Sequence, residues 1–373
     1  MKRALAGLAL LAIACTGSKQ MDYHVEGGSF VPASSPALLY SGRWDRTDPS
    51  LPKASWPGFA VSTDFKGSSI HVRMNDSGNY FNVEVDGKFL RVVGGESGSH
   101  LTYLLADNLG EGAHRVRLQR RNINFDEPTE IEGFVVDADA RLSLPEKSNR
   151  KRIEFIGDSY TAAEGNEAVS ATLPWEKKFP VTDFSKGYAS LLGEAMDADV
   201  TAVCRSGSGL VCNWKGGRKH PMGERYDWTL MERPVPAWKF GEPSADLVVI
   251  SLGLNDFSGL KNPDGTVSPA ASAEFRAAYR QLIAKVRRRH RKARIVALSP
   301  FTPWARENIS AVVAAEKAAG KNDIFHAQYD NFPDGYVADG HPTVATHRKM
   351  AAQILDQLKL LGLASDAGSL RER

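Results

Sequence analysis

Cysteine is scarce in this sequence, with three residues among 373, and neither sign of charge is in clear excess. Zinc sites need several cysteines and histidines at short, fixed spacings, and no such cluster occurs along the chain. The formal net charge is +3 at pH 7, whereas proteins that bind nucleic acid concentrate positive charge on one surface. The composition therefore argues against a zinc site and against a nucleic-acid partner.

Long hydrophobic runs are also missing. The apolar run at residues 4–14 follows Lys2 and Arg3 and is too short to span a bilayer, and no later run is long enough. It leads into the sequence AIACTGS at residues 12–18, which is similar to a bacterial lipobox with Cys15 as the lipidated residue. The pattern predicts an export signal over residues 1–20. The product is then a cell-envelope lipoprotein whose only membrane contact is the Cys15 anchor, or a secreted protein without Cys15.

Two cysteines, Cys204 and Cys212, remain after such a signal. Oxidising compartments favour a disulfide between nearby cysteines, and the bond would close a short glycine-containing loop. The alternative is two small buried thiols. We expect the disulfide.

The length and a hydrophobic content of 42% predict two domains with sizeable cores. Over residues 21–146, apolar and polar residues alternate in short segments, and Asp86 and Gly87 form a turn signal between two of them. This rhythm predicts a β-sandwich. The alternating segments are residues 70–74, 81–85, 114–121 and 131–136.

The rhythm changes over residues 150–365, where short apolar strands alternate with longer amphipathic segments. Such alternation predicts a parallel sheet that is covered by helices. Strands are expected at residues 153–156, 200–203, 247–252 and 294–298, and helices at residues 188–196, 270–289 and 344–361.

Ser159 follows the first strand of this second domain within the sequence GDSY. The carboxyl end of a strand faces the crevice where open α/β sheets bind ligands, so Ser159 is a candidate nucleophile. A serine hydroxyl needs a neighbouring base, and His341 in the sequence VADGHP is the candidate. Asp339 precedes it by two residues and is expected to orient the imidazole as the third member of a triad. The alternative for each is an ordinary turn residue.

Acyl transfer also needs donors for the developing oxyanion. The backbone N–H of Ser159, the backbone N–H of Gly207 in SGSG and the side-chain amide of Asn255 in GLND are the candidates. Gly207 and Asn255 each follow a predicted strand, so all three donors are expected at one sheet edge.

These four blocks resemble the SGNH (GDSL-type) hydrolases, whose Ser, Gly, Asn and His elements fall on Ser159, Gly207, Asn255 and His341. Residues 42–44, 56–58 and 76–87 look like the N-terminal jelly roll of carbohydrate esterase family 2. Residues 157–166, GDSYTAAEGN, resemble that family's G-D-S-x-T-x-G-x-G-N block, with Ala163 and Glu164 where glycine and an aromatic residue are usual.

The resemblance implies an all-β jelly-roll sandwich followed by a flavodoxin-like SGNH hydrolase domain. It also implies removal of acetyl groups from xylan or related carbohydrates without a metal or other cofactor. Some members use only a Ser–His dyad with the histidine held by a backbone carbonyl, and the presence of Asp339 favours a triad here.

Three aromatic side chains, Tyr160, Trp214 and Trp304, are candidates for stacking on sugar rings, with core packing as the alternative. The partner we expect is therefore an acetylated polysaccharide or oligosaccharide. Three other functions stay open: a lipase-like or thioesterase activity, acetyl transfer between sugars, and a non-catalytic carbohydrate-binding lipoprotein of the envelope.

Overall fold

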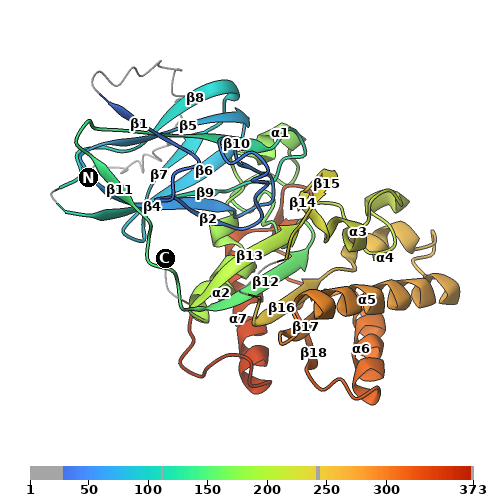
Figure 1. Ribbon diagram of the computed structural model, residues 1–373. Helices are drawn as coiled ribbons and strands as arrows, with labels where there is room; N and C mark the ends of the chain where they lie inside the picture. The colour runs from blue at the N-terminus through green and yellow to red at the C-terminus, as the bar shows by residue number, and fades with distance from the viewer. Residues whose placement is uncertain (1–27, 111, 241–243, 371–373) are drawn as a thin grey trace, which may run out of the picture.

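The computed structural model describes residues 28–110, 112–240 and 244–370. The predicted export signal over residues 1–20 and its Cys15 lie outside the described residues. Among the described helices, none is long and apolar enough to cross a membrane. The chain forms a strand-rich N-terminal domain and an α/β C-terminal domain, which lie side by side (Figure 1).

Two antiparallel sheets make up the N-terminal domain, as the period-two alternation predicted. One has the strand order β1-β10-β5-β8, with β3 paired to β10, and the other has the order β11-β4-β9-β6-β7, with β2 paired to β4. The sandwich is confirmed, whereas its jelly-roll topology stays a prediction. The strands are β1 (Ser29–Pro32), β2 (Leu39–Ser41), β3 (Lys53–Ala54), β4 (Ala60–Lys66), β5 (Ile70–Ser77), β6 (Tyr80–Val85), β7 (Lys88–Gly94), β8 (Ser97–Ala106), β9 (His114–Arg120), β10 (Thr129–Val136) and β11 (Arg141–Ser143).

Alternate residues of these strands face each other across a shared core. In β5, Ile70, Val72 and Met74 are fully buried because successive side chains point to opposite faces of a strand. The hairpin between β6 and β7 turns at Asp86 and Gly87, whose φ angles of 52° and 74° are those of a two-residue hairpin turn.

A parallel sheet with the strand order β13-β12-β16-β17-β18 forms the centre of the C-terminal domain. Counted along the chain this order is 2-1-3-4-5, the flavodoxin-like arrangement, which binds ligands where the order reverses beside the first strand. The strands are β12 (Lys151–Gly157), β13 (Ala198–Cys204), β16 (Leu247–Ser251), β17 (Arg294–Ser299) and β18 (Ile324–Gln328).

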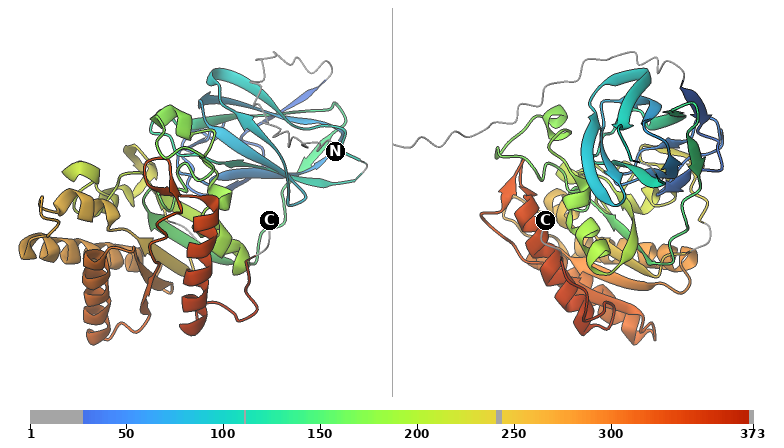
Figure 2. Two further views of the ribbon diagram at one scale, coloured as in Figure 1. Left: turned by 180° about the vertical axis from the view of Figure 1, so that it is seen from behind. Right: turned by 90° about the vertical axis from the view of Figure 1, so that its left-hand side faces the viewer.

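Helices cover this sheet in two pairs, with α2 beside α7 and α5 beside α6 (Figures 1 and 2). The longer helices are α2 (Tyr188–Ala195), α5 (Pro269–Arg289), α6 (Pro303–Ala318) and α7 (Val344–Leu360). The shorter elements are α1 (Trp175–Lys178), η1 (Phe184–Lys186), η2 (Trp214–Gly216), α3 (Met222–Arg225), α4 (Leu254–Leu260), and the pairs β14 (Trp228–Leu230) with β15 (Arg233–Ala237) and β19 (Tyr336–Val337) with β20 (His341–Pro342).

The sequence analysis did not predict α6, although the signals for it are present. Pro303 occupies the first turn, where its missing N–H costs nothing. Buried side chains then recur at helical spacing along Ala305, Ile309, Val312 and Val313.

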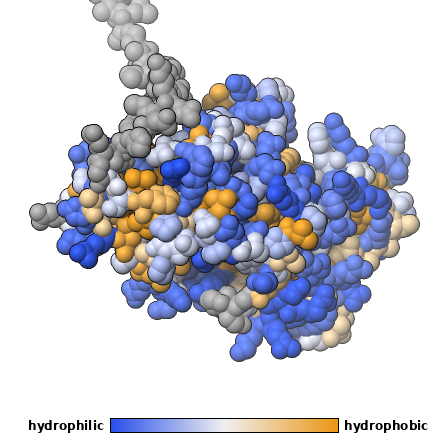
Figure 3. Space-filling model, turned by 45° about the horizontal axis from the view of Figure 1, so that its top comes forward, coloured by the Kyte–Doolittle hydropathy of each residue, from blue (hydrophilic) through white to orange (hydrophobic). Residues whose placement is uncertain are grey.

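The exposed large hydrophobic side chains are spread over both domains rather than gathered on one face. On the face shown in Figure 3, hydrophobic residues form separate groups among hydrophilic ones. Over both domains, the exposed large hydrophobic residues among those described are Phe30, Phe89, Leu90, Val92, Leu144, Val169, Trp214, Val235 and Leu360.

A buried arginine joins the two domains. Arg43, in the loop after β2, is 1% exposed, and its guanidinium donates to the carbonyls of Tyr226 and Trp228 at 2.6 and 3.0 Å. It also forms a 3.2 Å ion pair with Glu154 of β12. Burial alone would raise the pKa of Glu154, but hydrogen bonding from His290 and the charge of Arg43 lower it, so the carboxylate stays ionised inside the interface.

Replacing Arg43 with methionine keeps most of the side-chain volume but leaves Glu154 buried without its cation. Because an unpaired buried charge is costly, we expect Arg43→Met to lower the free energy of unfolding by about 3–5 kcal/mol in urea titrations. Arg91→Met, which breaks the exposed ion pair with Asp107, is the matched control and should cost less than about 1 kcal/mol. Equal losses in the two variants would contradict a structural role for the Arg43 pair.

Candidate active site

The turn after β12 holds Ser159 at the carboxyl edge of the parallel sheet. Gly157 ends the strand, and a Cβ there would lie 1.9 Å from the Thr161 hydroxyl oxygen, so only glycine fits. Asp158 accepts the N–H of Tyr160 at 3.0 Å and fixes the turn. Ser159 is 8% exposed, so its surroundings restrict access of water without closing it off.

Three strand ends meet at the amide of Asn255. Its Nδ2 donates to the carbonyl of Ser208, beyond β13, at 3.0 Å and lies 3.2 Å from Asp158 Oδ2, beyond β12. Asn255 itself lies in α4, directly after β16. The structure therefore brings together the blocks that contain Ser159, Gly207 and Asn255, at the point where the strand order reverses.

Gly207 has a φ angle of 75°, a conformation that favours glycine. Its carbonyl accepts the backbone N–H of Trp214 at 2.7 Å, so the main chain of Trp214 lies beside the predicted oxyanion donor. Trp214 is 58% exposed, and the ammonium of Lys215 lies 4.3 Å from its ring centroid. Of the three aromatic candidates for sugar stacking, Trp214 is the one whose side chain is exposed.

The loop from Gly207 to Cys212 is held by a buried carboxylate, and the predicted disulfide is wrong. Asp256 accepts the N–H groups of Leu210 and Val211, at 2.9 and 2.7 Å to Oδ1. Both Cys204 and Cys212 are free buried thiols with different neighbours. Cys204 packs in the core with Tyr188, whereas the Cys212 thiol lies 3.8 Å from the Asp256 carbonyl in α4.

A backbone carbonyl holds the ring of His341. Its Nδ1 lies 2.6 Å from the carbonyl oxygen of Ala338. Because a carbonyl can only accept, Nδ1 carries the proton and Nε2 of the neutral ring is the acceptor. His341 is therefore in the tautomer that a general base needs.

The predicted contact between Asp339 and His341 is corrected by the structure. Asp339 has a φ angle of 66° and its carboxylate turns to Lys178 of α1, with Oδ2 3.0 Å from Nζ. This hydrogen bond and the charge of Lys178 lower the pKa of Asp339. The place that a triad aspartate would take on the imidazole is filled by Ala338, one residue earlier.

Two of the aromatic candidates make packing contacts, the alternative to sugar stacking, and their stacking on sugar rings stays a prediction. Tyr160 is 7% exposed, and its hydroxyl donates to the Gly340 carbonyl at 2.9 Å, which ties the loop of His341 to the turn of Ser159. The ring of Trp304 lies against Phe275, with 4.8 Å between centroids, and its indole N–H donates to Ser272 of α5 at 2.9 Å.

Burial changes the acidity of two carboxyl groups beneath the site. It raises the pKa of Asp158 to about 7, with the nearby charges of Asp256 and Glu164 adding to the effect. It raises the pKa of Asp256 to about 6, against the three N–H groups that this carboxylate accepts. Among the described residues, no group of three or more His, Cys, Asp and Glu side chains is arranged to hold a metal ion.

Glu164 and Lys178 are site residues that the sequence analysis did not select. Glu164 Oε1 lies 2.7 Å from Lys178 Nζ and 3.7 Å from Nε2 of His341. The only sequence signal for Glu164 is its unusual place in the nucleophile block. Lys178 gives none, because it comes from a segment without a motif.

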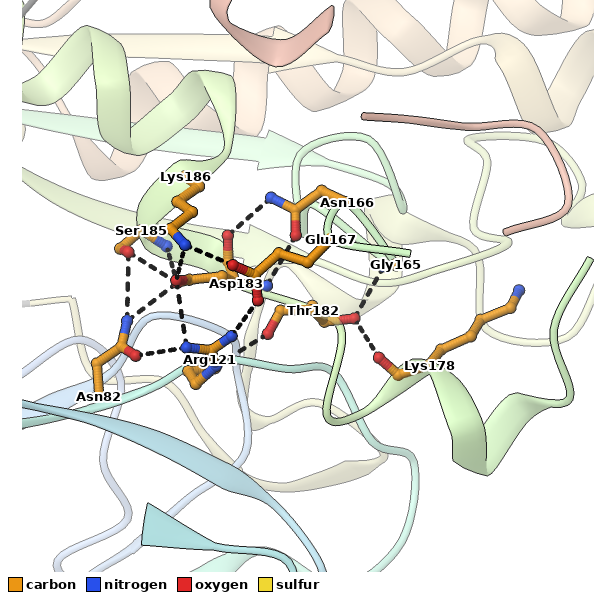
Figure 4. A network of polar contacts seen from close by, with 10 residues as sticks. All are labelled: Asn82, Arg121, Gly165, Asn166, Glu167, Lys178, Thr182, Asp183, Ser185 and Lys186. Carbon is orange, nitrogen blue, oxygen red and sulfur yellow. Dashed lines mark hydrogen bonds and ion pairs between the residues drawn. The ribbon is translucent and has the colours of Figure 1, made fainter. Parts of the chain in front are cut away.

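The segment that carries Lys178 is anchored to the N-terminal domain (Figure 4). Arg121, just beyond β9, donates to the Thr182 carbonyl at 3.2 Å and to Asn82 Oδ1 at 2.8 Å. Asn82 in turn donates to Asp183 at 3.0 Å, and the Thr182 hydroxyl accepts the N–H of Gly165 at 2.8 Å. The β-sandwich therefore fixes the loop that follows the nucleophile.

Known protein families match the two domains of this chain separately. The family model of the carbohydrate esterase 2 N-terminal domain matches residues 40–145, and that of the GDSL-like lipase/acylhydrolase family matches residues 155–349. The chain is 32% identical over 334 residues to the cellulase/esterase CelE of Acetivibrio thermocellus, which covers 87% of this chain and 39% of that protein. It thus spans about two fifths of that relative.

A second relative is an acetylxylan esterase/glucomannan deacetylase of Cellvibrio japonicus, 29% identical over 86% of both chains. A solved family two carbohydrate esterase from Clostridium thermocellum, in complex with cellohexaose, matches with a TM-score of 0.78. Its sequence identity is 30%, and the match covers 87% of this chain and 99% of that one. By its matched domains and its relatives, this chain belongs to carbohydrate esterase family 2, with a catalytic domain of the GDSL-like lipase/acylhydrolase family.

Proposed function

We propose that this protein hydrolyses acetyl esters on carbohydrate through an acetyl-enzyme at Ser159. The observation that carries the proposal is the fixed tautomer of His341, whose Nδ1 proton is held by the Ala338 carbonyl so that Nε2 can accept a proton. The Tyr160 hydroxyl ties this histidine loop to the nucleophile turn. Relatives named as acetylxylan esterase and glucomannan deacetylase support the substrate class.

In the proposed reaction, Ser159 Oγ attacks the acetyl carbonyl carbon while His341 Nε2 takes its proton. The carbonyl electrons move to an oxyanion held by the N–H groups of Ser159 and Gly207 and by the Asn255 amide. The Asn255 amide donates to the Ser208 carbonyl at 3.0 Å and to Asp158 Oδ2 at 3.2 Å, and we assign to the oxyanion the hydrogen that Asp158 now accepts, so that contact must give way when substrate binds. The sugar oxygen leaves with the proton from His341, and water then releases acetate by the same steps.

The catalytic unit in this proposal is a Ser–His dyad supported by a backbone carbonyl. A carbonyl dipole at Nδ1 fixes the ring and favours the imidazolium, which are the two tasks of a triad aspartate. We therefore propose the Ser–His dyad that some members of the family use, and not the triad that Asp339 had suggested.

We propose Trp214 as the contact for a sugar ring of the substrate. Its side chain is exposed and its backbone is hydrogen-bonded to Gly207, so a sugar stacked on the ring would lie close to the oxyanion donors. From the family resemblance we also propose that the N-terminal sandwich has a jelly-roll topology.

Export of the protein is a further proposal, which rests on the sequence of residues 1–20 and on Cys15 in its lipobox-like setting. The mass of the N-terminal peptide from natively expressed protein tests it, since a lipidated Cys15 adds acyl chains and plain secretion removes this residue.

The first test is acetate release from acetylated xylan by protein lacking residues 1–15. We expect activity in the parent and a loss of at least several hundred-fold in Ser159→Ala, because no other hydroxyl replaces the nucleophile. If the folded parent cleaves a small acetyl ester through Ser159 but leaves xylan intact, the substrate class is wrong. If neither ester is cleaved, the enzyme proposal fails and the carbohydrate-binding function takes its place.

Asp339→Asn separates the dyad from the triad. Because the Asp339 carboxylate lies on Lys178 and not on the imidazole, kcat should fall by less than about tenfold, whereas loss of a triad aspartate costs about 10⁴-fold. His341→Gln is the reference for loss of the base. A fall of Asp339→Asn to the level of His341→Gln, measured in acetate release, would contradict the dyad.

Trp214→Ala tests the sugar contact. We expect KM for acetylated oligosaccharide to rise by about tenfold, since stacking of this kind contributes about 1–1.5 kcal/mol, with little change for a small acetyl ester. Phe89→Ala is the matched control, because Phe89 is 59% exposed but lies in β7 of the sandwich. The same rise in both variants, or in neither, would remove Trp214 from the binding site.

A further inference from the structure

Glu164 is a buried carboxylate beside the proposed base, in a position where the family block usually has an aromatic residue. It follows the nucleophile by five residues, and its N–H donates to the Ser159 carbonyl at 3.1 Å. The side chain is 3% exposed, and its Oε1 lies 3.7 Å from Nε2 of His341. In the proposed reaction this is the ring nitrogen that takes the proton of Ser159.

Donors contact both oxygens of this carboxylate. Lys178 Nζ lies 2.7 Å from Oε1, and the Ser206 hydroxyl donates to Oε2. Lys178 is itself largely buried, and although burial lowers its pKa, the charges and hydrogen bonds of Glu164 and Asp339 raise it overall. Asp339 therefore acts on Lys178, and Lys178 acts on Glu164.

The energy of the contact between Glu164 and His341 depends on whether the imidazole is protonated. In the neutral ring Nε2 presents a lone pair to the carboxylate, which is unfavourable. Once the ring has taken the proton from Ser159, it carries a positive charge 3.7 Å from the carboxylate, which is favourable, while the proton itself still faces the reacting oxygen. Interactions that strengthen as the transition state forms are the ones that accelerate a reaction.

We propose that Glu164, and not Asp339, is the carboxylate that supports His341 during proton transfer, with Lys178 holding it in place. Glu164 is a positioning residue, since it acts through the imidazole. The inference rests on the proposed esterase function and adds to it a charge that the carbonyl of Ala338 cannot supply.

Other titratable groups also face His341, and their effects on the imidazole must be distinguished from the effect of Glu164. Asp339 in its own loop is 43% exposed by side chain and is paired, so solvent and Lys178 screen it. Asp158 lies under the nucleophile turn, and Tyr160 presents its ring edge 6.0 Å from the imidazole centroid. In α7, burial and the charge of His341 lower the pKa of His347 to about 3, so this residue stays neutral.

The test is the pH profile of kcat/KM for acetate release by the parent and Glu164→Gln. The amide has the shape of the carboxylate but no charge, so the acid limb should move to lower pH by about one unit. We also expect kcat to fall by about tenfold or more, with KM changed less than threefold. Glu164→Asp, which keeps the charge but withdraws it by one methylene group, should give a smaller shift.

Glu167→Gln is the matched control. Glu167 lies in the same loop and is also paired with a lysine and an arginine, Lys186 and Arg121, but it faces the N-terminal domain (Figure 4). Its pH profile should match that of the parent. An unshifted acid limb in Glu164→Gln, or the same shift in Glu167→Gln, would overturn the proposal.

A second readout keeps this test independent of turnover. Proton NMR follows the imidazole titration of His341, identified by the signal that is absent in His341→Gln, in the parent and in Glu164→Gln. A midpoint about one pH unit lower in Glu164→Gln supports the contact even if no ester is cleaved, in which case only the esterase proposal fails. An unchanged midpoint in a variant with parental thermal stability contradicts the role of Glu164.

Discussion

The site depends on one hydrogen-bonded contact at the carboxyl edge of the parallel sheet, the amide of Asn255 on the Ser208 carbonyl. This contact fixes the loop after β13 against the helix after β16, and the Asp158 carboxylate beside it fixes the turn after β12. The next residue, Asp256, holds the remainder of the loop after β13 through backbone N–H groups. Nucleophile and oxyanion donors are therefore placed by rigid elements, as preorganised catalysis requires.

The N-terminal sandwich supports the site by holding a segment of the catalytic domain in place. Its buried Arg43 and Arg121 are paired with Glu154 and Asp183 of the catalytic domain, so the interface has matched charges. Through Arg121 and Asn82 the sandwich holds the segment at Thr182 and Asp183, and this segment carries Lys178. In this account the sandwich contributes to catalysis by fixing the two segments that contain Glu164 and Lys178. This role does not depend on any binding of polysaccharide by the sandwich.

Two features of the fold could be predicted from the sequence because they depend on hydrophobic periodicity. The period-two segments became the sandwich, and the alternation of strands and helices became the parallel sheet. Since the carboxyl ends of parallel strands share one edge, polar residues just beyond them had to meet. The order of the blocks that contain Ser159, Gly207 and Asn255 was therefore sufficient to bring them together.

The two errors concern which way a side chain turns in a loop or at the end of a strand. Closeness in sequence suggested Asp339 for His341, but the positive φ angle of Asp339 directs its carboxylate to Lys178, a residue 161 positions away by number that no motif marks. Cys204 and Cys212 are near in sequence, yet one faces the core and the other faces α4. For Tyr160 and Trp304 the sequence left packing and sugar contact both open, and their polar groups have partners, Gly340 and Ser272, in distant elements.

The central claim is that an acetyl group passes through Ser159, with His341 as the base. The most direct measurement is an acid quench during turnover of an acetyl ester, followed by peptide mass mapping of the parent and of His341→Gln. The account predicts one acetyl group on the peptide that contains Ser159 in the parent, and its strong reduction in His341→Gln. Steady turnover with an acetyl group on another residue, or with none in the parent while Ser159→Ala remains active, would contradict it.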